Sequence, residues 1–254
     1  MKYARIYSTI GLLFIALPFL VSSFYFENDK KTGEIESIKT NIDGKGTGLE
    51  FNLTIGKEHN HPTFAIWLED MQGNYIQELY VTKSIASGIF AHGQKVPGVW
   101  SNEPGEVRLS AALPYFLHKR GIKAPDGTYL PTPANPIPDA YTGATPLASF
   151  KLESKSDTTL PTKFRIIVEV NQPWDWNEYW NNTIYIDDTN YKTSCQPALV
   201  YAVTVDLKNP MEYYVLNPIG HSHYSGHDGK LFTDLTSITT ALQIFSKIEV
   251  SLLP

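Results

Sequence analysis

The chain has 254 residues and a formal net charge of −5. Hydrophobic residues make up 42% of it and charged residues 19%, so the composition allows a sizeable core and excludes a chain that is disordered throughout. The acidic balance and the lack of a long basic run argue against duplex nucleic acid as a partner.

The N-terminus has the layout of a secretory signal. Lys2 and Arg5 precede an apolar run over residues 10–20, which small residues follow. We therefore predict a signal peptide over residues 1–23 and export to the periplasm. An uncleaved N-terminal membrane anchor is the alternative, because the apolar stretch continues to Phe26.

The remainder, residues 24–254, is expected to form a single domain with its core over about residues 45–254. Its single cysteine, Cys195, cannot form an intramolecular disulfide, so stability must come from packing. Aromatic residues at 13%, together with 17 glycines and 17 prolines, favour strands and turns over helices.

Apolar alternation or short apolar runs predict eight strands. They lie at residues 48–55, 62–71, 75–81, 148–152, 163–170, 198–207, 213–219 and 248–253. The second is apolar on both sides, with Phe64, Ile66 and Leu68 on one face and Ala65 and Trp67 on the other. Short strands separated by turns are typical of an all-β protein, and we predict an antiparallel β-sandwich.

Two helical segments and a connector complete the prediction. A short helix is expected over residues 109–120, interrupted by Pro114, and a second, amphipathic one over residues 234–246. Five prolines between Lys123 and Pro138 predict an extended connector.

A heptad over residues 139–145, with the sequence Asp-Ala-Tyr-Thr-Gly-Ala-Thr, follows that connector. It resembles the acceptor motif of extracytoplasmic flavoproteins, in which a flavin transferase esterifies FMN phosphate onto the final threonine. The resemblance implies Thr145 as the attachment residue and the other defined positions as recognition elements. Those positions are Asp139, Thr142, Gly143 and Ala144. The alternative is an ordinary turn, because Asp, Thr and Gly are turn-forming residues.

Three segments carry a wider resemblance. Residues 64–74, the heptad and residues 165–170 occur in the same order in a family of predicted periplasmic proteins that share a domain of unknown function. That family resembles an immunoglobulin-like sandwich similar to the repeat of the flagellar hook-capping protein. The resemblance implies a place in membrane-linked electron transfer, with a membrane redox protein as partner.

A histidine cluster near the C-terminus offers a second candidate site. His221, His223 and His227, with Asp228 beside them, supply imidazole and carboxylate groups of the kind that bind zinc or copper. Their spacing matches no established ligand motif, so a glycine-rich connection is the favoured interpretation. A weaker pair, His59 and His61, precedes the second strand.

The aromatic run at residues 174–180 offers a third candidate site. Its rings could stack on a sugar or a flavin, although core packing is the more common use of such residues. Asp175 and Glu178 could form a glycosidase pair, but nothing in the sequence fixes their separation. Cys195 precedes a buried strand and is expected to be inert.

The favoured hypothesis is an exported β-sandwich protein that carries covalent FMN on Thr145 and acts as an electron carrier rather than a turnover enzyme. The alternative is a non-catalytic binding or assembly module without a cofactor. It would present the aromatic run or the histidine cluster to a glycan, a metal or a membrane partner.

Overall fold

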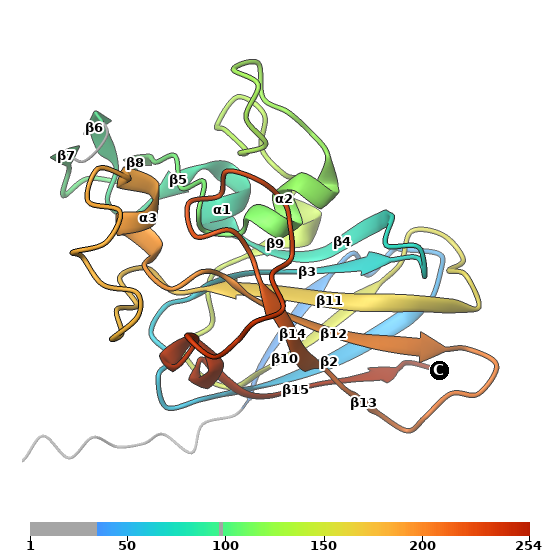
Figure 1. The fold of residues 1–254 in the computed structure, drawn as a ribbon. Coiled ribbons are helices and arrows are strands. Elements are labelled where there is room, and N and C mark those ends of the chain that lie inside the picture. The colour runs from blue at the N-terminus through green and yellow to red at the C-terminus, as the bar shows by residue number, and fades with distance from the viewer. Residues whose placement is uncertain (1–34, 97–98) are drawn as a thin grey trace, which may run out of the picture. The chain divides into compact units, whose positions relative to one another are not determined.

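Two β-sheets face each other across a shared apolar core in the computed structural model, which describes residues 35–96 and 99–254 (Figure 1). The five-stranded sheet has, in order across it, β1 (Glu36–Thr40), β10 (Phe150–Lys155), β2 (Gly48–Ile55), β15 (Phe245–Leu252) and β13 (Tyr214–Val215). The six-stranded sheet has β14 (Asn217–His221), β12 (Leu199–Asp206), β11 (Lys163–Asn171), β3 (Thr63–Glu69), β4 (Tyr75–Thr82) and β9 (Thr142–Gly143).

The predicted all-β sandwich is confirmed. Most neighbouring strands are antiparallel, as expected, but one pair at the edge of each sheet is parallel: β1 with β10, and β4 with β9. The predicted strand over residues 213–219 is divided, since β13 lies in one sheet and β14 in the other.

Strand β3 is buried along its whole length because both of its faces are covered. Phe64, Ile66 and Leu68 lie in the core between the sheets, as predicted. Ala65 and Trp67 point the other way, into a second apolar cluster on the outer face of the six-stranded sheet. The protein therefore has three layers. The six-stranded sheet lies in the middle, with the five-stranded sheet on one face and an outer cover of helices and loops on the other.

The outer cover contains the short helices and two small strand pairs. The helices are α1 (Lys83–Ser87), α2 (Pro114–Arg120) and α3 (Thr189–Ser194); the strand pairs are β5 (Ile89–Phe90) with β8 (Gly105–Glu106) and β6 (Gln94–Val96) with β7 (Val99–Trp100). Pro114 begins α2 rather than interrupting it, because the first turn of a helix needs no N–H from that residue. The predicted helix over residues 234–246 is wrong: only a 3₁₀ turn, η2 (Thr240–Gln243), precedes β15.

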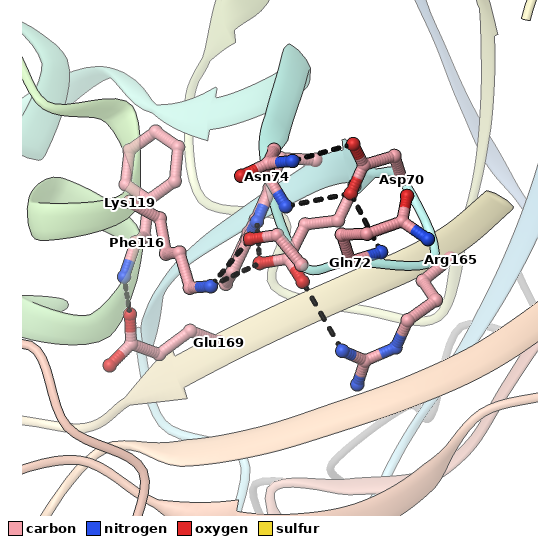
Figure 2. A network of polar contacts seen from close by, with 10 residues as sticks. Asp70, Gln72, Asn74, Phe116, Lys119, Arg165 and Glu169 are labelled. Atoms are coloured by element: carbon pink, nitrogen blue, oxygen red, sulfur yellow. Dashed lines mark hydrogen bonds and ion pairs between the residues drawn. The ribbon is translucent and has the colours of Figure 1, made fainter.

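Helix α2 is fixed to the sheet by a buried carboxyl group. Glu169 of β11 is fully buried and accepts hydrogen bonds from the backbone N–H groups of Tyr115 (3.2 Å) and Phe116 (2.7 Å). Figure 2 shows the contact with Phe116. Burial raises the pKa of Glu169 to about 8, against the lowering effect of the two N–H donors.

A second buried carboxylate, Glu69 at the end of β3, joins the same layer. Its oxygens pair with Arg165 Nη1 at 3.3 Å and Lys119 Nζ at 3.7 Å, and accept a hydrogen bond from Trp67 Nε1. Figure 2 shows Lys119 and Arg165 approaching the β3–β4 hairpin from opposite sides. Because Lys119 of α2 and Arg165 of β11 both pair with this buried anion of β3, the ion pairs connect the outer helix to the two central strands.

The predicted signal or anchor over residues 1–23 lies outside the described residues. Within residues 35–96 and 99–254, no helix combines the length and the apolarity needed to cross a membrane.

Candidate functional site

Thr145, the aromatic run, His61 and His221 lie at or just beyond strand ends at one end of the sandwich, where β2, β4, β11 and β14 finish (Figure 1). The ring of Phe64 at the start of β3 meets both Phe150 and Phe245, which begin β10 and β15, at 5.7 Å between centroids. The starts of these strands from both sheets therefore meet here. Residues 144–149 cross this end from β9 in one sheet to β10 in the other.

The heptad is an edge strand held against β4. Asp139 and Tyr141 bound a 3₁₀ turn, and Thr142 and Gly143 form β9, paired with Val81 and Thr82. The exposed Asp139 and the partly buried Thr142 lie beside each other, with the Thr142 hydroxyl 3.5 Å from the Asp139 carboxylate.

Gly143 is required by its neighbour Tyr80. A Cβ at this position would lie 3.0 Å from the tyrosine ring, closer than most side-chain contacts in proteins. One residue later, the Tyr80 hydroxyl donates a 2.6 Å hydrogen bond to the carbonyl oxygen of Ala144. The glycine thus allows the close approach that lets Tyr80 fix the backbone just before Thr145.

Thr145 follows this fixed point on a loop rather than within a strand pair. Its side chain is partly exposed and that of Ala144 is exposed. Among the hydrogen bonds of the described residues, none engages the Thr145 hydroxyl. The next residue, Pro146, is buried, and its carbonyl oxygen accepts a 2.9 Å hydrogen bond from His59 Nε2. The hydroxyl is thus presented between two anchored neighbours.

Tyr141 anchors the other end of the heptad. Its hydroxyl donates to both carboxylate oxygens of Asp157, at 3.1 and 3.0 Å. Burial and the adjacent Asp157 carboxylate raise the pKa of Tyr141 to about 12, so the phenol stays neutral and keeps donating.

The aromatic run is a surface feature supported by partly buried hydrogen bonds. Trp174 and Tyr179 are 53% and 51% exposed, and Trp176 lies at the surface between them. Beneath them, the Asn177 side chain donates to the carbonyl of Ser237, and Trp180 Nε1 donates to the Ser237 hydroxyl. The sequence alone favoured core packing for this run, whereas the structure exposes three of its four aromatic side chains.

Asp175 and Glu178 point into different environments. Asp175 is buried, receives the Thr240 hydroxyl, and has its pKa raised by burial. Glu178 is exposed. Because one carboxylate is buried and the other is exposed, the structure gives the glycosidase pair no support.

Residues from the run and from distant loops enclose a cleft of about 660 Å³. The rings of Trp100 and Trp174 meet edge to face, 5.9 Å apart. The remaining lining residues are His61, Phe90, Ala91, His92, Ser101, Asn102, Leu109, Pro173 and Thr193. His61 and Trp174 were already candidates from sequence patterns, whereas His92 and Trp100 lie in a segment without apolar periodicity and were assigned to no site.

Two of the residues that line this cleft have strained backbones. His61 (φ 54°) and Trp174 (φ 63°) both adopt the left-handed region, although neither is glycine. Cys195, whose backbone pairs with that of Asp175, also has a positive φ (67°), but its ψ of −92° lies outside the left-handed helical region. Each such residue costs on the order of 1–3 kcal/mol, and strain of this kind gathers at functional sites.

The histidine cluster does not form a three-imidazole site. His221 stacks on Phe232, and His223 stacks on Tyr224, while the rings of His223 and His227 lie 6.1 Å apart. Burial lowers the pKa of His223. In the part of the chain that the structure describes, no three His, Cys, Asp or Glu side chains are grouped to hold a metal ion.

Cys195 is fully buried, and burial raises the pKa of its thiol far above the usual range. A thiol that stays protonated is a poor nucleophile, in keeping with the inert role expected from the sequence.

Comparison with known protein families, with curated proteins and with solved structures finds no match to this chain. The assignment of a function therefore depends on the site itself.

Proposed function

We propose that this chain is an exported carrier of covalent FMN in extracytoplasmic electron transfer, with Thr145 as the attachment residue. The observation that carries the proposal is the presentation of the Thr145 hydroxyl: partly exposed, without a hydrogen-bond partner among the described residues, and placed on a loop at the end of the sandwich. The complete acceptor heptad and the N-terminal export signal in the sequence support it further.

The residues present fit the attached group. The Thr145 oxygen would form an ester with the FMN phosphorus, while the bond from that phosphorus to the nucleotide portion of a flavin dinucleotide breaks. The threonine proton would pass to a base of the flavin transferase. The exposed Ala144, which has a small side chain, leaves the backbone beside the hydroxyl open to that enzyme.

The attached flavin would supply the one- and two-electron chemistry, and the protein would supply position and surroundings. In this function the protein is a redox carrier, and its partners are the flavin transferase and a membrane redox protein.

The test is the intact mass of the chain co-expressed with a periplasmic flavin transferase. We expect an increase equal to FMN less one water and a fluorescent band in a denaturing gel. Both signals should be absent from Thr145→Val and retained in Thr159→Val, which changes an exposed loop threonine outside the heptad. An unmodified mass, in a host whose transferase modifies a control substrate, would refute the proposal.

The exposed aromatic run favours a second candidate, a non-catalytic module that binds a glycan. Trp174 and Tyr179 are each more than half exposed, which suits stacking on sugar rings. Retention on an insoluble polysaccharide, lost in Tyr179→Ala and independent of Thr145, would favour this function instead.

A further inference from the structure

We propose that the cleft between Trp100 and Trp174 binds a flat, uncharged heteroaromatic ring with an N–H donor at its edge, the chemistry of an isoalloxazine ring. The source of the ring rests on the proposed function, because a flavin on Thr145 would supply it. The shape and the lining of the cleft do not depend on that attachment.

The size and polarity of the cleft indicate an uncharged ligand. Its volume of about 660 Å³ lies within the range of small-molecule sites. Phe90, Leu109 and Pro173 make its walls largely apolar. Its lining residues, all of which the structure describes, include no Asp, Glu, Lys or Arg. A charged ligand that lies wholly within this lining would lose water without gaining a charged partner, because Glu106, Arg108 and two lysines lie in the adjoining hollow on the other side of the tryptophans.

The two tryptophans indicate a flat ligand. Their rings meet edge to face, and Trp174 is 53% exposed and Trp100 39% exposed, so ring surface remains uncovered. An aromatic ligand that stacks there buries this surface and gains the offset contacts that aromatic rings prefer.

The two histidines indicate a donor on the ligand. His92 Nδ1 lies 3.3 Å from the carbonyl oxygen of Ser101, and His61 Nδ1 lies 3.0 Å from the side-chain oxygen of Asn60. Both partners accept, so each Nδ1 carries the proton, and in the neutral ring each Nε2 is left as an acceptor. A ring with an N–H at its edge complements these acceptors, whereas a ring that carries only carbonyl groups does not.

One loop connects the cleft to the heptad. His59 binds the carbonyl oxygen of Pro146, next to Thr145, and two residues later His61 lines the cleft. His61 and Trp174, two of the lining residues, both have left-handed backbones. A ring attached to Thr145 therefore has this cleft at the same end of the sandwich as its point of attachment.

The test uses the full chain with Thr145→Val, which cannot be esterified, and riboflavin, which carries no phosphate. Titration should give saturable quenching of riboflavin fluorescence. Affinity should fall at least tenfold in Trp100→Leu and Trp174→Leu, and should stay unchanged in Trp176→Leu, which alters the same aromatic run outside the cleft. Menadione, a flat ring with carbonyl groups and no N–H, should bind at least tenfold more weakly than riboflavin.

Replacement of the exposed His92 by leucine provides a variant that leaves the core intact. This variant should bind riboflavin more weakly. Its affinity for riboflavin should also exceed its affinity for menadione by a smaller factor than in the parent chain. The inference is overturned if the folded Thr145→Val chain does not bind riboflavin saturably, if menadione binds as tightly, or if Trp176→Leu weakens binding as much as Trp174→Leu.

A further measurement shows where the ring bound in the cleft comes from. If the flavin on Thr145 occupies the cleft, the flavinylated wild-type chain will no longer bind riboflavin. If that chain still binds riboflavin, the cleft serves a separate flavin. Failure of attachment would refute the proposed function, yet the riboflavin titration of the Thr145→Val chain would still decide the inference.

Discussion

The Tyr80 hydroxyl and the Ala144 carbonyl oxygen are 2.6 Å apart, and this contact joins a core side chain to the heptad. Tyr80 is fully buried and its ring stacks on Phe64 at 4.9 Å, so its position is set by the core. The loop that carries Thr145 therefore begins from a fixed point, while the threonine itself remains accessible.

Tyr80→Phe and Gly143→Ala should each disturb the contact between Tyr80 and the heptad and lower the stability of the chain. The first removes one hydrogen bond and should lower the free energy of unfolding by about 1 kcal/mol. The second places a methyl group 3.0 Å from the Tyr80 ring and should cost about 1–3 kcal/mol. Urea denaturation measures both. The double variant should lose less than the sum, because the added methyl group also contacts the Tyr80 hydroxyl. Strict additivity would contradict the contact.

Stability should fall as the pH rises toward 8 because of Glu169. Its pKa is raised from 4.5 in the unfolded chain to about 8 in the folded one, so the folded state binds the extra proton between these values. The contribution of this proton to the free energy of unfolding is complete below pH 4.5 and is lost as the pH rises through 8. Between these values the free energy of unfolding falls by up to about 1.4 kcal/mol per pH unit.

Glu169→Gln isolates this effect. The amide does not titrate, so the difference in unfolding free energy between wild type and variant should change with pH between 5 and 8. Its NH₂ group faces a backbone N–H of Tyr115 or Phe116, which makes the variant less stable at pH 5. Parallel pH profiles for the two proteins would show that Glu169 does not titrate in this range.

The parts that sequence patterns predicted are those set by local periodicity. The side chains of β3 alternate between its two faces as expected: Phe64 lies in the core between the sheets, and Trp67 lies in the outer apolar cluster. Strand β1 was not predicted, because it is a mostly exposed edge strand whose polar residues carry no pattern. The predicted helix over residues 234–246 was wrong because its apolar residues pack from a turn and a strand instead.

The candidate site was predictable only in pieces. The heptad could be read from its composition, but its pairing with β4 depends on residues about 60 positions away in the sequence. The cleft brings together Trp100 and Trp174, which are also far apart in the chain. It depends on loop residues with left-handed backbones, which the conformational preferences of the amino acids do not predict. A lone tryptophan in a Gly- and Ser-rich stretch was the one local signal for it.

Asp188 should stabilise the helix beside the cleft. Its carboxylate accepts hydrogen bonds from the backbone N–H groups of Asn190 and Tyr191, both at 3.0 Å, and so caps α3. Asp188→Ala should cost about 1 kcal/mol in unfolding free energy. Asp187→Ala is the matched control, because Asp187 is the exposed neighbour and is no part of the cap. Equal losses in the two variants would contradict the capping role.

His61 should show opposite effects on stability and on binding. Its φ of 54° favours glycine, so His61→Gly should relieve backbone strain and leave the chain at least as stable as the wild type. The same change removes an acceptor from the cleft, so riboflavin binding by the Thr145→Val chain should weaken several-fold. Urea denaturation and fluorescence titration of one preparation measure both quantities.

Replacement of Lys57, an exposed residue of the same loop, by glycine is the comparison for His61→Gly. It adds the same flexibility without relieving a left-handed residue, so it should lower stability slightly and leave binding unchanged. If His61→Gly instead destabilises the chain as Lys57→Gly does, the left-handed backbone is not strained. If it leaves riboflavin binding intact, His61 is not part of the site. Gain of stability with loss of binding is the result expected of a residue held in strain for the sake of a ligand.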